Sequence, residues 1–531
     1  MRNSALALVI CLAAPAIAQQ PAAGGEAPLS AIDWLRPSTV AQPAPGAVVV
    51  LPGGGATLPA PLPEPPAVRD ATSPSVTVTP LDAPRVDAVG LLPSHVTGLP
   101  ATLWSNSRAA DVTALIAARR VDRLPAMQAL FYTLLLAEAE PTADAGQEAP
   151  VLQARIDALM RLGAVEPAQA MLDRAGPTTP DLFRRWFDAT LLTGDEDQAC
   201  AALAARPHLA PDYAARVFCT ARRGDWNTAA LTLDTARALG FISDTEDRLL
   251  AQFLDPEMFG DEPLPLPPVR PSPLMFRLYE AAGEPLPTTT LPRAFAMADL
   301  RPTAGWRAEL ISAERLTQTG ALSVNRLLGV YKDRRPAASG GIWDRVAAIQ
   351  RLDAALGRGD AVAVSEHLPP AWAAMRAARL EVAFAELYAE PLLEMATSGR
   401  PPTGRAAALI YDIALLGAQY ESAARALGER HPARAFETAL AKGAPPDSGA
   451  DRMQDAIARG FAGPELPPEV VQMLAEGRLG EVILQAMAQY ERAAGGDLNA
   501  LPVALATLRH VGLEDSARRA ALQMALLRFG G

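Results

Sequence analysis

The feature that most constrains this chain is a helical periodicity that begins near residue 105 and is interrupted at short intervals by glycine. Apolar residues recur three and four positions apart, the spacing of one face of an α-helix. Glycines also precede an alanine by five residues, so that a small residue falls one turn into the next helix. The sequence therefore predicts an all-α fold of helical hairpins, and the glycines of its repeat turns are Gly163, Gly194, Gly224 and Gly512.

The first three of these glycines lie 31 and 30 residues apart, so each interval has room for one helical hairpin. In turns such as Leu192-Thr193-Gly194-Asp195 the chain resembles the tetratricopeptide-type helical repeats, most closely over residues 151–250. The resemblance implies an α-solenoid-like body, in which stacked hairpins bury a core between them. Such a body presents a long surface suited to binding peptides or other proteins.

The N-terminus has the three parts of an export signal. Arg2 supplies a basic start, an apolar core runs from Ala5 to Ala14, and small residues follow at Ala16 and Ala18. This pattern predicts a signal peptide over residues 1–18, cleaved before Gln19. The mature protein is therefore expected in the periplasm or outside the cell, and no later stretch is long and apolar enough to anchor it in a bilayer.

Residues 19–104 are expected to form a disordered, extended, proline-rich linker. Sixteen prolines fall in the 82 residues from Gln19 to Pro100, and proline fixes its own φ and disfavours helix in the residue before it. A short apolar island over residues 31–35, which ends in Trp34 and Leu35, interrupts this arm. The island either packs on the helical body or docks on a partner protein.

A second proline-rich stretch divides the helical part. Seven prolines lie in the nineteen residues from Asp255 to Pro273, a density that excludes a continuous helix. The sequence thus predicts a helical-repeat segment over 105–254, a break over 255–273 and a second helical segment over 274–531.

Two cysteines, Cys200 and Cys219, remain after signal cleavage. Their helices should join near Leu209, which lies nine residues after the first cysteine and ten before the second. In an antiparallel hairpin the two thiols then stand at nearly the same height, and an exported protein can form a disulfide. The alternative is a pair of buried free thiols.

One loop combines residue types common in binding sites. Flexible glycines lie beside an aromatic residue, and a basic pair precedes them. This candidate binding loop consists of Arg334, Arg335, Ser339, Gly340, Gly341 and Trp343.

Acidic clusters have simpler explanations than catalysis. The run Asp195-Glu196-Asp197 directly follows a helix-ending glycine, where acidic residues stabilise the start of the next helix. Glu386, Glu390 and Glu394 share one helical face, although Pro391 should break that helix midway. We expect both groups to be structural.

Other recognisable chemistry is not evident in the sequence. The five histidines are isolated, so no metal site is predicted. We find no Gly-x-Ser-x-Gly nucleophile turn, no phosphate-binding glycine loop and no cofactor motif. The formal net charge of -11 argues against a nucleic-acid partner.

These observations favour an exported interaction or scaffold module that binds a protein or peptide of the bacterial cell envelope. The alternative is a helical cell-wall-acting enzyme with a glutamate as general acid or base, for which Glu381, Glu386 and Glu390 are the first candidates. The stretches 79–94 and 99–104 also resemble exported bacterial proteins of unassigned role, some with an antifreeze-type name. Ice binding is not predicted, because regular Ala-Ala-Thr repeats are missing.

Overall fold

The computed structural model describes residues 86–146, 148–259, 263–444 and 448–527. All of these belong to one compact unit, Thr79–Gly531. The predicted signal peptide, most of the arm and its Trp34-Leu35 island lie outside the described residues. In the described part the all-α prediction is confirmed, since its β-structure is limited to an isolated bridge between Leu92 and Ala137.

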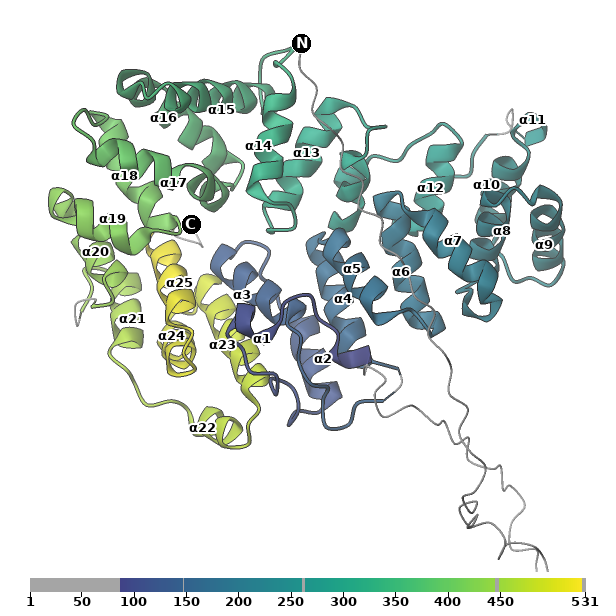
Figure 1. Ribbon diagram of the computed structural model, residues 1–531, viewed down its shortest axis with the longest axis horizontal. Coiled ribbons are helices and arrows are strands. Elements are labelled where there is room, and N and C mark those ends of the chain that lie inside the picture. Colours follow the sequence, from purple (N-terminus) through teal and green to yellow (C-terminus); the bar gives the residue numbers. More distant parts are fainter. Residues whose placement is uncertain (1–85, 147, 260–262, 445–447, 528–531) are drawn as a thin grey trace, which may run out of the picture. The chain divides into compact units, whose positions relative to one another are not determined.

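The helices of the first half are mostly short, and many begin at proline or end at glycine (Figure 1). Proline suits the first turn, where its missing N–H has no intrahelical partner. The helices of this half are η2 Val86–Ala88, α1 Ser94–Thr97, α2 Ala109–Ala118, α3 Pro125–Leu136, α4 Pro150–Leu162, α5 Val165–Ala175, α6 Pro180–Thr193, α7 Glu196–Ala205, η3 Pro207–Leu209, α8 Tyr213–Arg222, α9 Trp226–Ala238, α10 Asp244–Leu254, α11 Pro256–Phe259 and α12 Pro273–Ala281.

The second half begins with 3-10 turns and continues with longer helices. They are η4 Thr288–Thr290, η5 Arg293–Leu300, α13 Trp306–Thr317, α14 Val324–Asp333, α15 Ile342–Gly357, α16 Ala361–Ala377, α17 Glu381–Thr397, α18 Arg405–Leu416, α19 Tyr420–Leu427, η6 Gly428–Arg430, η7 Pro432–Arg434, α20 Ala435–Ala441, α21 Arg452–Phe461, α22 Pro468–Ala475, α23 Leu479–Ala494, η8 Leu498–Ala500, α24 Leu501–His510 and α25 Glu514–Leu527.

The four glycines singled out in the sequence each lie in a turn between two helices that pack on each other: α4 and α5, α6 and α7, α8 and α9, and α24 and α25. Their φ angles are positive, at 88°, 97°, 87° and 84°, a backbone region that favours glycine. The alanine five residues later is fully buried each time. A small residue at that position lets the helices of each pair approach closely.

The last helices of the chain pack against the first ones. Helix α23 contacts α2, and α25 contacts α3. Gly480 of α23 donates its N–H to the carbonyl of Leu103, and the Trp104 ring lies against the same glycine. The predicted linker to residue 104 is therefore too long, because the packed body already includes residues 86–104, with Leu103 and Trp104 in its core.

The proline-rich stretch 255–273 does not separate two independent segments. Helix α12 packs on α6 and α10, and η5 packs on α4 and α6, so helices from both sides share one hydrophobic core. Within the stretch the described residues form only the short helix α11. Proline prevents a continuous helix here, but it does not prevent packing on both sides.

Pro391 does not end its helix, contrary to expectation. Helix α17 runs through it without interruption, with Tyr388 and Leu392 buried on either side. A proline costs one backbone hydrogen bond, and here the burial of the apolar face offsets that loss. Across the ranges that the structure describes, no helix is long and apolar enough to cross a membrane.

Candidate functional site

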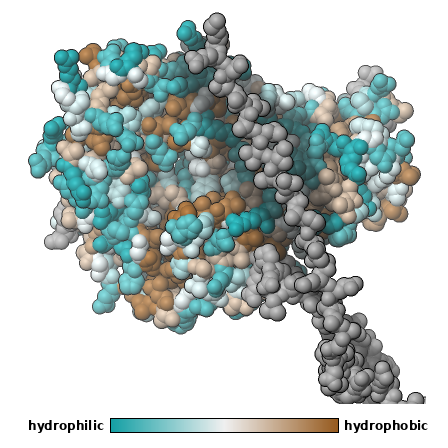
Figure 2. Space-filling model, viewed as in Figure 1, coloured by the Kyte–Doolittle hydropathy of each residue, from teal (hydrophilic) through white to brown (hydrophobic). Residues whose placement is uncertain are grey.

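Exposed apolar side chains gather in one part of the body. Ten large apolar residues of the described chain are exposed, and seven of them lie between residues 226 and 269. In Figure 2 apolar side chains lie scattered among hydrophilic ones at the surface of the right-hand end, where α8 to α10 lie. We call these seven exposed residues together the apolar platform: Trp226, Leu231, Leu239, Phe241, Met258, Leu266 and Val269.

Helix α9 provides the centre of the platform. Its buried stripe is Ala229, Leu233 and Ala236, spaced so that one face packs on α8 and α10. Leu231 lies on the opposite face and is 68% exposed. The sequence contains a signal for this exposure, since Leu231 lies outside the apolar stripe of its helix.

The segment after α11 lies beside α9 and α10. Pro263 and Pro265 line a small hollow together with Arg237 of α9 and Asp247 of α10. The carbonyl of Pro265 also accepts a hydrogen bond of 2.7 Å from the Tyr279 hydroxyl of α12. These contacts fix the backbone that carries the exposed Leu266 and Val269.

A row of aromatic rings connects the platform residue Trp226 to the core. Phe187 of α6 contacts Phe218 of α8, which stacks on Phe253 of α10, with centroid distances of 6.2 and 5.3 Å. Phe253 in turn contacts Trp226 at 6.1 Å. The row ends at this half-exposed tryptophan, so Trp226 joins the surface to the core.

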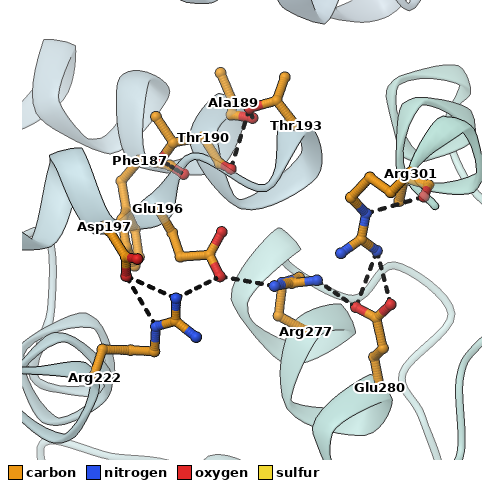
Figure 3. A network of polar contacts seen from close by, with 11 residues as sticks. Phe187, Ala189, Thr190, Thr193, Glu196, Asp197, Arg222, Arg277, Glu280 and Arg301 are labelled. Atoms are coloured by element: carbon orange, nitrogen blue, oxygen red, sulfur yellow. Dashed lines mark hydrogen bonds and ion pairs between the residues drawn. The ribbon is translucent and has the colours of Figure 1, made fainter. Parts of the chain in front are cut away.

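A chain of alternating charges joins α7 and α8 to the helices after the proline-rich stretch (Figure 3). Glu196, which is 2% exposed, pairs with Arg222 of α8 at 3.5 Å and with Arg277 of α12 at 2.7 Å. Arg277 also pairs with Glu280, and Arg301 donates two hydrogen bonds to the same carboxylate. This network holds α12 against the hairpin formed by α7 and α8.

Asp195, Glu196 and Asp197 lie at the N-terminus of α7 as expected, but their carboxylates do more than stabilise the helix start. Asp195 is the N-cap residue of α7 but makes no side-chain cap bond, and its carboxylate accepts instead from Gln169. The Glu196 carboxylate is buried because two arginines, distant in sequence, neutralise it. Sequence spacing alone could not place Arg277 next to Glu196.

The two cysteines lie on the same hairpin. The structure joins Cys200 of α7 to Cys219 of α8 by a disulfide, with the Cα atoms 4.8 Å apart. The bridge closes the turn that contains η3. It therefore restrains α8, one of the two helices on which α9 packs.

Removing this bridge should lower the free energy of unfolding by about 3 kcal/mol, since it releases a closed loop in the unfolded chain. The test is urea denaturation of the oxidised protein and of the double variant Cys200→Ser, Cys219→Ser. Reductant should destabilise the parent equally and leave the variant unchanged. Equal stability of parent and variant would contradict the bridge.

The carboxylates of Asp188 on α6 and Asp212 before α8 interact electrostatically. Asp212 is the N-cap of α8 and accepts from the Ala215 N–H at 2.7 Å. Burial and, secondly, the nearby Asp212 carboxylate raise the pKa of Asp188 on α6 to about 7. Asp188 therefore titrates near neutral pH.

Substituting Asp188→Asn should stabilise the protein above pH 7. Because the pKa of Asp188 is raised, the folded state keeps a proton on this carboxyl that the unfolded state has released. The free energy of unfolding therefore falls as pH rises from about 4 to 7 and is lowest above pH 7. We expect a gain on the order of 1–2 kcal/mol at pH 8 and almost none at pH 4, after allowance for partial exposure. Urea midpoints across this pH range measure it, with the exposed Asp234→Asn as control. A pH-independent effect would contradict the raised pKa.

The candidate binding loop of residues 334–343 packs on α13 and not on the platform. Trp343 lies against Trp306 of α13, with centroids 5.1 Å apart. Gln350 donates to the carbonyl of Arg334, and Gly340 donates to the Asp344 carboxylate. Gly340 and Gly341 have positive φ angles, so the backbone conformation is sufficient reason for glycine at both positions.

The rest of the loop is exposed, including Arg334, Arg335 and Ser339. The structure therefore leaves the loop open to solvent on one side while Trp343 anchors it. It does not bring the loop residues into contact with the platform residues.

The three glutamates of the enzyme alternative all lie on α17. Desolvation by surrounding protein raises the pKa of half-buried Glu381 and of Glu386, although Glu386 is exposed at the surface; a raised pKa is what a general acid requires. Glu390 accepts a hydrogen bond from Gln419. Within the described ranges, no group of three or more His, Cys, Asp or Glu residues could hold a metal ion.

Comparison of the chain with protein-family models, with curated proteins and with solved structures gave no match.

Proposed function

We propose that this protein is an exported interaction module of the bacterial cell envelope and that the apolar platform binds its protein or peptide partner. The single observation that supports this most is the concentration of seven exposed large apolar residues between 226 and 269. Exposed apolar patches mark binding surfaces, because water contact with them is costly unless a partner covers them.

The supports beneath the platform favour the same function. The disulfide, the aromatic row and the Glu196 network hold α8, α9 and α10 in one arrangement. A preorganised surface loses less conformational entropy on binding. The resemblance to tetratricopeptide-type repeats supports a protein or peptide partner as well.

Site-specific photo-crosslinking in intact cells tests this proposal. A photoreactive residue at Leu231 or Phe241 should capture the same partner. The matched control is Val362 of α16, which is 80% exposed but lies outside the platform. Capture at all three positions alike, or at none, would contradict the proposal.

A variant with a charged platform makes the test quantitative. Leu231→Asp with Phe241→Asp should reduce capture at Val269 at least tenfold, because burying a carboxylate against an apolar partner is unfavourable. The circular dichroism spectrum should remain unchanged, since both side chains are exposed. Val362→Asp should leave capture at Val269 intact.

The raised pKa values of Glu381 and Glu386 support a second candidate, the cell-wall-acting enzyme. Incubation of the purified protein with peptidoglycan should then release soluble fragments. Glu381→Gln and Glu386→Gln, tested singly, would identify the acid. Release that survives both substitutions would exclude this site.

A further inference from the structure

The segment Val86–Leu92, which we call the strap, is held on the body as a bound peptide would be. It starts in the 3-10 turn η2 and continues without helix to Leu92. Its receiving surface consists of α4, α5 and residues 135–138 at the C-terminal end of α3. An exposed four-residue helix, α1, connects the strap to the rest of the chain.

Most polar contacts of the strap involve its main chain. Arg155 of α4 donates to the carbonyl of Val89, and Arg174 of α5 donates to that of Gly90, both at 2.7 Å. The N–H groups of Leu91 and Leu92 both donate to the Leu136 carbonyl, at 2.8 and 2.9 Å. The Leu92 carbonyl accepts from Glu138 at 2.8 Å. This pattern resembles the addition of a peptide to an exposed backbone edge.

Two strap residues add sequence specificity. The Asp87 carboxylate accepts from the N–H of Leu152 at 2.9 Å, in the first turn of α4, where the helix dipole favours negative charge. A Cβ at Gly90 would lie 2.4 Å from the carbonyl carbon of Ala137, so only glycine fits there. The buried Val89 lies between these two residues.

The receiving surface does not depend on the strap to orient its main donor. The Arg155 guanidinium is 1% exposed and donates to the carbonyls of Leu135 and Ala137, both at 2.7 Å. Neither acceptor belongs to the strap. Two bonds thus fix the guanidinium, and Nη1 donates a third to the Val89 carbonyl.

We infer that this surface is a peptide-recognition site for segments of the form Asp-x-Val-Gly-Leu and that the chain's own strap is its resident ligand. The Arg155 guanidinium binds the main-chain carbonyl of the valine, and the Leu152 N–H at the start of α4 binds the aspartate carboxylate. The backbone of Ala137 leaves room only for glycine at the next position. A ligand held in this way is exchangeable once its covalent connection is cut.

A cleavable full-length protein tests the inference. A protease recognition sequence replaces α1, Ser94–Thr97, and cleavage then frees the strap from the body while both remain in solution. The N-terminal fragment should co-elute with the body in size exclusion. A fluorescent peptide with the sequence of residues 86–93 should displace the fragment and bind saturably.

Variants of this peptide test the specificity. Gly90→Ala should weaken binding at least a hundredfold, and Asp87→Asn about tenfold. Ala88→Ser serves as the matched control and should bind within threefold of the parent peptide. Dissociation of the fragment without saturable peptide binding would overturn the inference, as would equal binding of the Gly90→Ala peptide.

A measurement on the uncut chain covers the case in which the body unfolds without its strap. Gly90→Ala in the intact protein should raise amide exchange at Leu91, Leu92 and Glu138 at least tenfold. Exchange in the interior of α15, which these residues do not contact, serves as the control and should stay unchanged. Unaltered exchange at all three amides would overturn the inference.

Discussion

Arg155→Met should lower the free energy of unfolding by about 4–5 kcal/mol. The substitution keeps most of the aliphatic volume but removes three hydrogen bonds, to the carbonyls of Val89, Leu135 and Ala137. Each carbonyl would remain buried without that donor, and an unsatisfied buried acceptor costs about 1–3 kcal/mol. Urea denaturation followed by circular dichroism measures the loss.

Arg174→Met is the matched control for this prediction. Arg174 also donates to a strap carbonyl, that of Gly90, but its side chain is 51% exposed. Water can replace its hydrogen bond, so we expect a loss of about 1 kcal/mol or less. Similar losses for the two variants would show that burial of Arg155 is not the cause.

Burial lowers the pKa of Arg155 to about 10, so the guanidinium stays protonated at neutral pH. Its effect on stability should therefore be constant between pH 5 and 8. The destabilisation of Arg155→Met should not change over this range, in contrast to the pH-dependent effect of Asp188→Asn.

Gly480→Ala should destabilise the protein by about 4 kcal/mol, although alanine is the better helix former. A Cβ at this position would lie 2.2 Å from the Trp104 ring. Either the buried tryptophan leaves its site or α23 moves away from the first helices. Displacing a buried tryptophan costs about 3–5 kcal/mol, which outweighs the gain in helix propensity of about 1 kcal/mol.

Gly329→Ala provides the opposite control. Gly329 lies inside α14, and a Cβ there would meet nothing within 4 Å. The same substitution should therefore stabilise the protein by about 1 kcal/mol. A stabilising effect at both positions, measured as urea midpoints, would contradict the close contact between Trp104 and α23.

Several features of the fold could be predicted from local pattern. Positive φ at Gly163, Gly194, Gly224 and Gly512 follows from a turn between two packed helices, and glycine is the residue that adopts it freely. The pairing of Cys200 with Cys219 follows from their nearly equal distance to one turn. In both cases the residues concerned are close in sequence, so local geometry is sufficient.

The candidate site could be predicted only in part. Exposed apolar residues such as Leu231 can be recognised by their position opposite a buried stripe. Arg155 also leaves a signal, because it interrupts the apolar stripe of Leu152, Ile156 and Leu159 in α4. Sequence does not show which carbonyls satisfy such an arginine, because Val89 lies 66 residues away.

The sequence by itself determined the helical class, the hairpin turns and the cysteine pair, because helix periodicity, glycine conformation and short loops act over a few residues. Only the tertiary structure decided that α23 and α25 pack on α2 and α3, that Glu196 is buried between two arginines, and that residues 86–104 belong to the body. These contacts join residues far apart in the chain. They depend on the burial of apolar surface and the neutralisation of buried charge, which spacing along the sequence does not encode.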